Sequence, residues 1–276
     1  MTPTRPACPD PEPDAEHARQ HGFALLIVLW TLVLLALLAA TVTATGRSET
    51  RIASNLVGSA NAEAAADGGV AAAMFHLLIS SNQHWPANGL VHQLVLGHET
   101  VDVAIYDQDG MVDPNQSPPA LIAALLRQIG LDDTAAQTLA NAIVDWRSPT
   151  DGGLLPQYQG AGRIFGPPHQ PFQSAAELGL VLGMTPRITE LLAPHINPYV
   201  QSTPDPNLAD PLVAAALTDA MNRDHVSLDP ATPDGPQLVL ISATASGAGA
   251  TFTRRALIRF DSSNDPPFTT LEWYAG

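Results

Sequence analysis

The sequence predicts an α+β fold in which helices and strands occupy separate stretches of the chain. Residues 23–45 contain no ionisable side chain, and an apolar stripe with helical spacing continues from them to about residue 81. Strand signals lie at residues 98–107 and again between residues 237 and 274. The stretch between these strand signals has apolar residues at helical spacing, which is the pattern of a helical domain inserted between strands.

Composition limits the classes of function. The chain has 276 residues, of which 45% are apolar, and this is enough for a substantial core. Its formal net charge is −15, and all 12 basic residues are arginines. A surface this acidic repels phosphate, so binding of nucleic acid through basic contacts is disfavoured. Cys8 is the only cysteine, which excludes an intramolecular disulfide and a cysteine-based zinc site.

The uncharged run at residues 23–45 is long enough to span a membrane. As a helix it extends about 35 Å, and the hydrocarbon core of a bilayer is about 30 Å thick. The alternative is a signal peptide cleaved before Thr45, with Val42 and Ala44 as the small residues at the cleavage site. Signal peptides have apolar regions of about 7 to 15 residues after a basic segment, whereas two arginines and four acids precede this run. We therefore predict a membrane span, and the arginines on both sides leave its orientation open.

The next elements are a strand and a series of helices. In residues 98–107, Val101, Val103 and Ile105 alternate with polar or small residues, which predicts a half-buried strand. Four apolar stripes predict helices between residues 120 and 197. Residues 174–177 have the spacing of a capping box, and Thr185 precedes a proline in the manner of an N-cap.

The final part of the chain is predicted to return to strands. A short helix is expected over residues 207–221, followed by strands over residues 237–245, 251–260 and 269–274. The glycine-containing segment at residues 246–249 favours a hairpin between the first two of these strands.

The start of the uncharged run resembles the processing site of type IV pilin-like proteins, because Gly22 is followed by Phe23. The resemblance implies that a prepilin peptidase cleaves after Gly22 and methylates the new amino group of Phe23. Most members of that family have a glutamate at the fifth mature position, where this chain has Ile27. In the family this glutamate neutralises the terminal amine of the subunit above, and an unpaired carboxylate in an apolar setting is costly. Ile27 therefore fits a subunit that has no other subunit above it.

Further motifs resemble the protein K family, the largest minor pseudopilins of type II secretion systems. They are DWR at residues 145–147 and the segments at residues 171–178 and 181–186, in the order expected for the family. The resemblance extends from residue 23 to residue 274, although residues 203–214 depart from an asparagine-rich segment and the leader is longer and more acidic than usual. It implies a type IV pilin-like fold, a long N-terminal helix packed on an antiparallel sheet, with an inserted all-helical domain.

The resemblance also implies domains and a role. The domains are a cleaved leader (1–22), the transmembrane and pilin helix (23–81), a pilin-like α/β domain in two parts (82–116 and 201–276) and a helix-hairpin-helix domain (117–200). The implied role is that of a non-enzymatic subunit at the tip of the pseudopilus, which initiates or caps assembly and supports protein export. The implied partners are the minor pseudopilins I and J, then H and the major pseudopilin. The implied location is the inner membrane, crossed once, with the C-terminal domain in the periplasm.

The turn after the first predicted strand is a candidate calcium site. Asp107, Asp109 and Asp113 surround Gly110, and clustered carboxylates on a turn are ligands that Ca²⁺ prefers. The segment lacks the glutamate that completes an EF-hand loop, and a solvated turn that ends a strand explains the same acids.

A second candidate calcium site comprises Asp145, Asp151 and Glu177, because members of the protein K family bind calcium in this domain. A metal there would fasten the loop-rich segment that follows Arg147. Two structural alternatives remain: Glu177 completes the capping box, and Asp145 pairs with Arg147 or caps a helix.

No catalytic constellation stands out. His92 and His98 lack the His-Glu-x-x-His spacing, and neither a nucleophile elbow nor a phosphate loop is present. Residues 179–184 resemble a helix-hairpin-helix turn, which holds a DNA phosphate in other proteins. The alternative function is therefore a signal-anchored periplasmic helix-hairpin-helix binding module, and an enzyme is disfavoured.

Overall fold

The computed structural model describes residues 15–79, 81–150, 152–227, 235–247 and 249–276, and the side chains of these residues other than 15–22 and 42–48. The chain divides into two compact units, Met1–Gly58 and Ser59–Gly276. Helix α1 (Ala15–Leu78) contributes its first part to the first unit and its remainder to the second.

The first unit contains the apolar part of α1. Residues 23–41 are long and apolar enough to cross a membrane, with 19 residues, a mean hydropathy of 2.9 and no part buried within the structure. A signal sequence near an N-terminus also passes this test of length and hydropathy. The helix already begins at Ala15, before the uncharged run, because residues 15–22 contain good helix formers and no proline.

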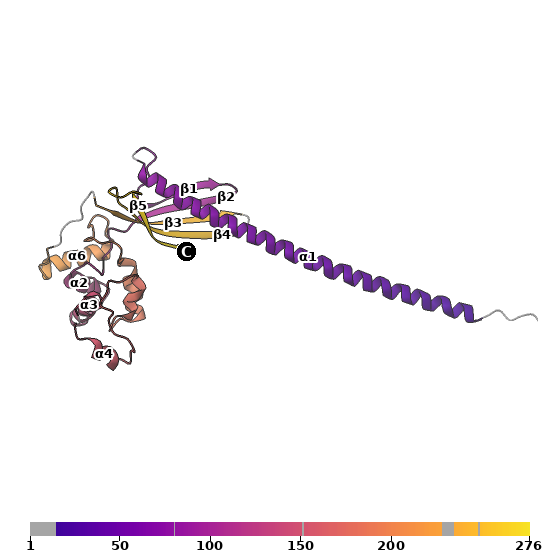
Figure 1. Cartoon of the computed structure of the whole chain (residues 1–276), viewed down its shortest axis with the longest axis horizontal. Coiled ribbons are helices and arrows are strands. Elements are labelled where there is room, and N and C mark those ends of the chain that lie inside the picture. Colours follow the sequence, from indigo (N-terminus) through magenta and orange to yellow (C-terminus); the bar gives the residue numbers. More distant parts are fainter. Residues whose placement is uncertain (1–14, 80, 151, 228–234, 248) are drawn as a thin grey trace, which may run out of the picture. The chain divides into compact units, whose positions relative to one another are not determined.

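The second unit contains a five-stranded antiparallel sheet whose strands follow one another in sequence order (Figure 1). Its strands are β1 (Asn88–Leu96), β2 (Glu99–Asp107), β3 (Gln237–Gly247), β4 (Ala250–Phe260) and β5 (Phe268–Ala275). The four strands predicted from the sequence are confirmed, and so is the hairpin that joins β3 to β4. Strand β1 was not predicted, because Val91 and Val95 place apolar side chains on its exposed face, so apolar and polar residues do not alternate along it.

The second part of α1 packs against one face of this sheet through small residues. Ala62, Ala66 and Val70 are fully buried there, in a core that also contains Val101 of β2. A Cβ at Gly69 would lie 2.8 Å from Cγ1 of Val101, so helix and sheet approach each other more closely than a side chain allows. Gly69 lowers the helix propensity of this segment, but it allows α1 to pack closely against the sheet.

Between β2 and β3 the chain forms a block of helices with its own hydrophobic core. Its elements are α2 (Pro119–Gln128), α3 (Asp133–Arg147), α4 (Leu155–Gly160), η1 (Ala175–Leu180), α5 (Pro186–Leu192), η2 (Ala193–His195) and α6 (Pro211–Arg223). Tyr158 of α4 is fully buried in this core, and its hydroxyl accepts the N–H of Leu182. The loop-rich segment after Arg147, expected to have few apolar anchors, is thus anchored by an aromatic side chain.

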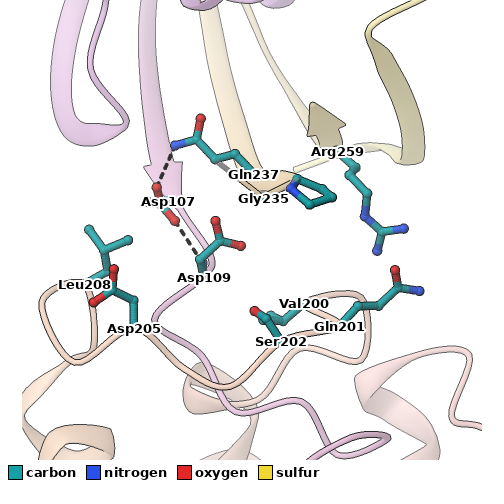
Figure 2. A pocket seen from close by; sticks show the side chains of 11 residues that line it. Asp107, Asp109, Val200, Gln201, Ser202, Asp205, Leu208, Gly235, Gln237 and Arg259 are labelled. Atoms are coloured by element: carbon teal, nitrogen blue, oxygen red, sulfur yellow. Dashed lines mark hydrogen bonds between the residues drawn. The ribbon is translucent and has the colours of Figure 1, made fainter. Parts of the chain in front are cut away.

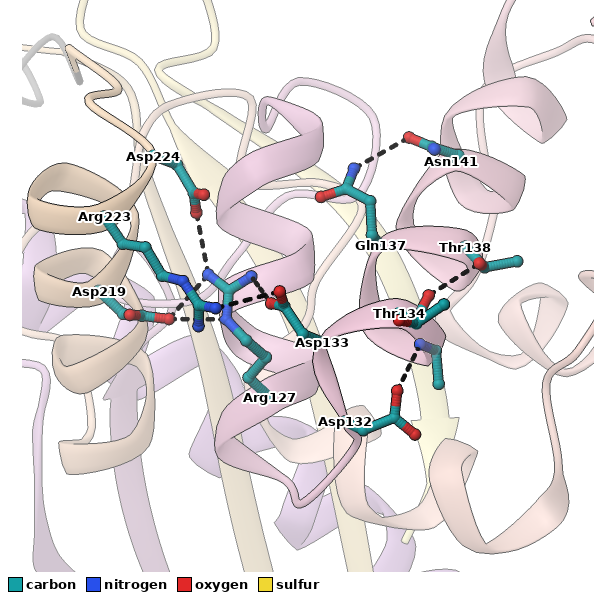
Figure 3. Close-up of polar contacts among 11 residues, drawn as sticks. Arg127, Asp132, Asp133, Thr134, Gln137, Thr138, Asn141, Asp219, Arg223 and Asp224 are labelled. Atoms are coloured by element: carbon teal, nitrogen blue, oxygen red, sulfur yellow. Dashed lines mark hydrogen bonds and ion pairs between the residues drawn. The ribbon is translucent and has the colours of Figure 1, made fainter.

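Charged side chains join three helices of this block. Figure 3 shows the guanidinium of Arg127, at the end of α2, among carboxylates from two other helices. It lies 3.3 Å from Asp133 of α3, 2.7 Å from Asp219 of α6 and 2.9 Å from Asp224 after α6. The side chain of Arg127 is mostly buried, so these contacts fix how the helices pack.

The predicted capping box at residues 174–177 is wrong. Ser174 makes no side-chain capping hydrogen bond, and the following turn is a 3₁₀-helix. The carboxylate of Glu177 instead accepts the N–H of Gln173, with both oxygens 3.2 Å away. The N-cap at Thr185 is confirmed, because its hydroxyl accepts the N–H of Ile188.

Helix α6 begins later than the predicted residue 207. Asp210 acts as its N-cap and accepts the N–H groups of Leu212 and Val213, so the helix starts at Pro211. Proline has no backbone N–H and favours this first helical position.

The segment that leads from β2 into the helical block is joined to the segment between η2 and α6. Val112 and Ile196 form an isolated parallel bridge. Beside it, fully buried Asp113 accepts the N–H of Asn115 at 2.6 Å and the N–H of Gln201 at 3.0 Å. The segment by which the chain enters the helical block is therefore hydrogen-bonded to the segment between η2 and α6.

Candidate functional site

The predicted processing and assembly residues lie in α1. The backbone of Gly22 is helical, and Phe23 and Ile27 follow with 68% and 49% of their surface exposed. The segment that follows exposes further leucine, valine and isoleucine side chains. This apolar surface needs lipid or other helices around it.

The first acidic candidate site borders a pocket of about 520 Å³ in the second unit. Figure 2 shows Asp107, Asp109 and Asp205 around this pocket, with Arg259 on its other side. Asp107 accepts a hydrogen bond from the Gln237 amide at 2.7 Å and another from the N–H of Asp109 at 2.8 Å. Two of the three predicted ligands therefore lie together.

Asp109 is the most strongly perturbed acid of this pocket. Burial raises the pKa of Asp109 to about 7, and the carboxylates of Asp107 and Asp205 add to the rise. The N–H of Leu238, which donates to Asp109 at 3.2 Å, and the charge of Arg259 oppose it. The pocket has three acidic side chains and one basic side chain, that of Arg259, so it carries an excess of negative charge.

Asp113, the third predicted ligand, is not brought to this pocket. Burial raises its pKa to about 6, although the N–H groups of Asn115 and Gln201 and the charge of Arg147 favour the ionised form. Its carboxylate oxygens already accept these two N–H groups. In this structure Asp113 holds the junction between sheet and helices together.

Asp145, of the second candidate site, lies in α3 with only 8% of its surface exposed. Both carboxylate oxygens are buried without a hydrogen-bond partner in the described part of the chain. The expected pair with Arg147 does not form, because that guanidinium donates to the carbonyl oxygens of Pro114 at 2.5 Å and Ser117 at 2.7 Å. The two residues are two positions apart in α3, so their side chains point to different sides of the helix, and Arg147 makes long-range contacts instead.

A pocket of about 340 Å³ opens beside Asp145, lined also by Asn141, Ser148, Thr150 and Gly152. A Cβ at Gly152 would overlap the Asp145 carboxylate, so glycine leaves space for it. Asp151 lies outside the described residues. Among the residues described, no three His, Cys, Asp or Glu side chains are grouped so that they could hold a metal ion.

The surroundings of Asp145 nevertheless suit a hard cation. Two unpartnered, buried carboxylate oxygens are costly unless a cation or donors meet them. The amide of Asn141 and the hydroxyls of Ser148 and Thr150 line the same pocket and offer the oxygen ligands that Ca²⁺ prefers. Glu177 is used by its own turn, through the N–H of Gln173.

Several residues of these sites were not singled out from the sequence. Asp205 and Arg259 reach the first pocket from distant parts of the chain, and only the folded structure brings them to Asp109. Glu99 was not singled out either, and it is almost fully buried at the start of β2. An acid at the first position of a row of alternating apolar residues was the available signal for Glu99.

Comparisons with known proteins agree on one system. Residues 88–199 match the family model described as type II secretion system (T2SS), protein K. A chain of "The Crystal Structure of the GspK-GspI-GspJ complex from enterotoxigenic Escherichia coli Type 2 Secretion System" has a similar fold, with a TM-score of 0.56 and 15% sequence identity. This similarity covers 83% of the present chain and 98% of that chain. No curated protein matches the chain significantly.

The long apolar helix, the antiparallel sheet and the match over residues 88–199 all agree with the class of type II secretion system components. Within that class, residues 88–199 match the protein K family, and the fold resembles that of a chain in the GspK-GspI-GspJ complex. The protein K resemblance found in the sequence is thereby confirmed.

Proposed function

We propose that this minor pseudopilin is the tip subunit of the pseudopilus, a non-enzymatic protein that initiates or caps assembly. The observation that carries the proposal is Ile27, which stands in an exposed apolar stretch of α1 without any acid between residues 23 and 41. A subunit above would bring a terminal amine that this stretch cannot neutralise. The helical block between β2 and β3 adds bulk that suits an end position.

In this proposal the fold is of the type IV pilin kind, and the precursor is held in the inner membrane by residues 23–41. Prepilin peptidase cleaves after Gly22 and methylates Phe23. Residues 59–276 then lie in the periplasm, where the apolar surface of the first part of α1 passes from lipid to the helices of other subunits. Residues 23–41 are strongly apolar and are not buried within the structure, which supports contact first with lipid and then with other helices.

The proposed partners are the minor pseudopilins I and J, and beyond them H and the major pseudopilin. Support comes from the fold match, because the similar chain belongs to a structure of a GspK-GspI-GspJ complex. Secreted proteins would pass the outer membrane with the help of the assembled pseudopilus.

We further propose calcium as a structural ligand of the helical block, held by Asp145 with oxygens of Asn141, Ser148 and Thr150. The two unpartnered carboxylate oxygens support this assignment. The metal would supply charge that offsets the buried carboxylate, and Asp151 is positioned by sequence to complete the set. The Asp107 and Asp109 pair is a weaker second candidate, because Arg259 already lies at its pocket.

Two measurements test the tip assignment. Mass spectrometry of the protein purified from its own host should find N-methylated Phe23 as the first residue. Gold labelling of an epitope in the helical block should mark one end of isolated pseudopili. Label along the whole shaft would contradict the tip role, and a mature start at Thr45 would support the signal-anchored binding module instead.

A further inference from the structure

The side chain of Glu99 is buried at the start of β2. Burial alternates along this strand, so Glu99 shares a face with Val101 and Val103, the face that packs against α1. Only 3% of Glu99 is exposed, and its Oε2 has no hydrogen-bond partner within the described chain. A buried carboxylate in this state is costly, so a donor or cation is expected to meet it.

The surrounding backbone leaves space for this carboxylate. Glu99 pairs with Leu96 across the turn between β1 and β2, and on its other side lies Gly247 of β3. A Cβ at Gly247 would overlap the carboxylate oxygens of Glu99. Glycine at this position therefore accommodates a charged group that a larger residue would displace.

A pocket of about 330 Å³ opens at this carboxylate. Besides Glu99, its lining residues are Asn61, Ala64 and Ala65 of α1 and Leu96, Gly97 and His98 of the hairpin. The walls are thus mostly small or apolar, and His98 is the only basic residue of this lining. Arg254, which reaches α1 from β4, is already paired with Glu63 and Asp67.

We propose that this pocket receives the ammonium group of a lysine from a neighbouring pseudopilin. A lysine has an aliphatic stem that suits apolar walls and a compact charge that requires few acceptors. Calcium would need six to eight oxygen ligands, and only Glu99 and Asn61 offer side-chain oxygens. The chain contains no lysine and has a net charge of −15, so the ammonium group has to come from another chain. This inference rests on the proposed function for the identity of the neighbour.

The test uses the full chain, co-expressed with the I and J pseudopilins of its own system and extracted in detergent. A water-soluble carbodiimide joins a carboxylate to a lysine amine in contact, forming an amide with loss of one water. Because this chain lacks lysine, mass spectrometry should find Glu99 linked to a lysine of I or J. Glu99→Gln should abolish that link and raise the dissociation constant at least about tenfold. The matched control Asp102→Asn, at an exposed acid of the same strand, should change neither.

A second variant separates lost binding from lost folding. Ala64→Leu places a good helix former at the exposed mouth of the pocket and should weaken binding to a similar degree. If both variants bind I and J with the affinity of the wild type, the proposed lysine pocket is wrong, and the proposed function is unaffected. Weaker binding of Glu99→Gln without a cross-link at Glu99 would point to an arginine and overturn the lysine assignment. Failure of the wild-type chain to bind I and J would contradict both proposals.

Discussion

The guanidinium of Arg254 in β4 lies 2.6 Å from Oδ1 of Asp67 in α1, and a second nitrogen lies 2.7 Å from Glu63 one turn earlier. The Arg254 side chain is largely buried and also lies over the rings of Phe252 and Trp273. One arginine thus joins the helix to the sheet by two ion pairs, while its two ring contacts are to residues of the sheet itself.

Replacing Arg254 should loosen the helix from the sheet. Arg254→Met keeps much of the side-chain volume but leaves Asp67 and Glu63 unpaired. Because both carboxylates are partly exposed, we expect a loss of about 1 kcal/mol in the free energy of unfolding, measured by urea titration of the full chain in detergent. Arg254→Lys should recover only part, since lysine cannot bond both acids in the same geometry. Full stability of Arg254→Met would refute the role given to these ion pairs.

Because α1 lies close to the sheet at Gly69, we expect the effect of a valine substitution on stability to depend on its position in α1. Gly69→Val would bring Cβ against Val101 and force the helix away from the sheet, with an expected loss of about 1 to 3 kcal/mol. Ala71→Val, on the exposed side of the same turn, is the control and should cost less than about 1 kcal/mol. The comparison can be made by thermal unfolding. Equal losses in both variants would show that helix propensity, rather than packing, accounts for the effect.

Asp109 should make stability depend on pH. Its pKa of about 7 lies above the ordinary value of 3.8, so between these values the folded chain holds more protons than the unfolded chain. The free energy of unfolding should therefore fall as pH rises from about 4 to about 7, and then level off. Asp109→Asn should reduce this dependence, leaving the part that Asp113 contributes through its pKa of about 6, and should be the more stable form at pH 8. Urea titrations in chelator at pH 5 and pH 8 measure the difference, and parallel pH profiles of the two proteins would exclude Asp109 as its source.

Calcium should stabilise the helical block through Asp145. We expect millimolar calcium to raise the melting temperature of the full chain, because binding to the folded state alone shifts the folding equilibrium. Asp145→Ala combined with Asp151→Ala should remove this shift, and Asp107→Ala combined with Asp109→Ala should leave it intact. Identical melting curves of the wild-type chain in calcium and in excess chelator would contradict a structural metal. Loss of the shift only in the second double variant would transfer the site to the pocket of Figure 2.

Ile27 predicts how secretion responds to an added acid. Ile27→Glu introduces a carboxylate without a partner into the membrane-spanning part of α1, so we expect unchanged or reduced secretion of exoproteins. Ile27→Leu is the control and should behave as the wild type. Higher secretion by Ile27→Glu than by the wild type would contradict the tip position.

Most elements of the fold could be predicted from the sequence because their signals are local. The alternation of Val101, Val103 and Ile105 identifies β2, and the N-cap at Thr185 marks a helix start that the structure confirms. Strand β1 was not predicted because Val91 and Val95 are apolar but exposed. Ser174 was wrongly predicted as a cap because it makes no capping hydrogen bond at the start of its 3₁₀-helix.

The sites were harder to predict than the elements, because distant residues complete them. Asp109 acquires its raised pKa from burial and from Asp205, nearly a hundred positions later in the chain. Pairing of Asp145 with Arg147 was one of the alternatives left open by the sequence, but carbonyl oxygens from the segment before α2 accept hydrogen bonds from Arg147 instead. Sequence spacing does not show which carbonyl oxygens are left without another donor in the folded chain, and those oxygens are the ones that accept from Arg147.

The junction formed by Val112 and Ile196 has a consequence for how the molecule folds. Strands β2 and β3 pair Asp107 with Val239, so the sheet is completed only after the ends of a very long intervening stretch meet. Closing so long a loop is slow and entropically unfavourable. Helices that collapse early through local contacts would bring Val112 and Ile196 together and shorten the span that must still be closed. Damage to the helical core should therefore slow sheet formation, even though no strand is altered.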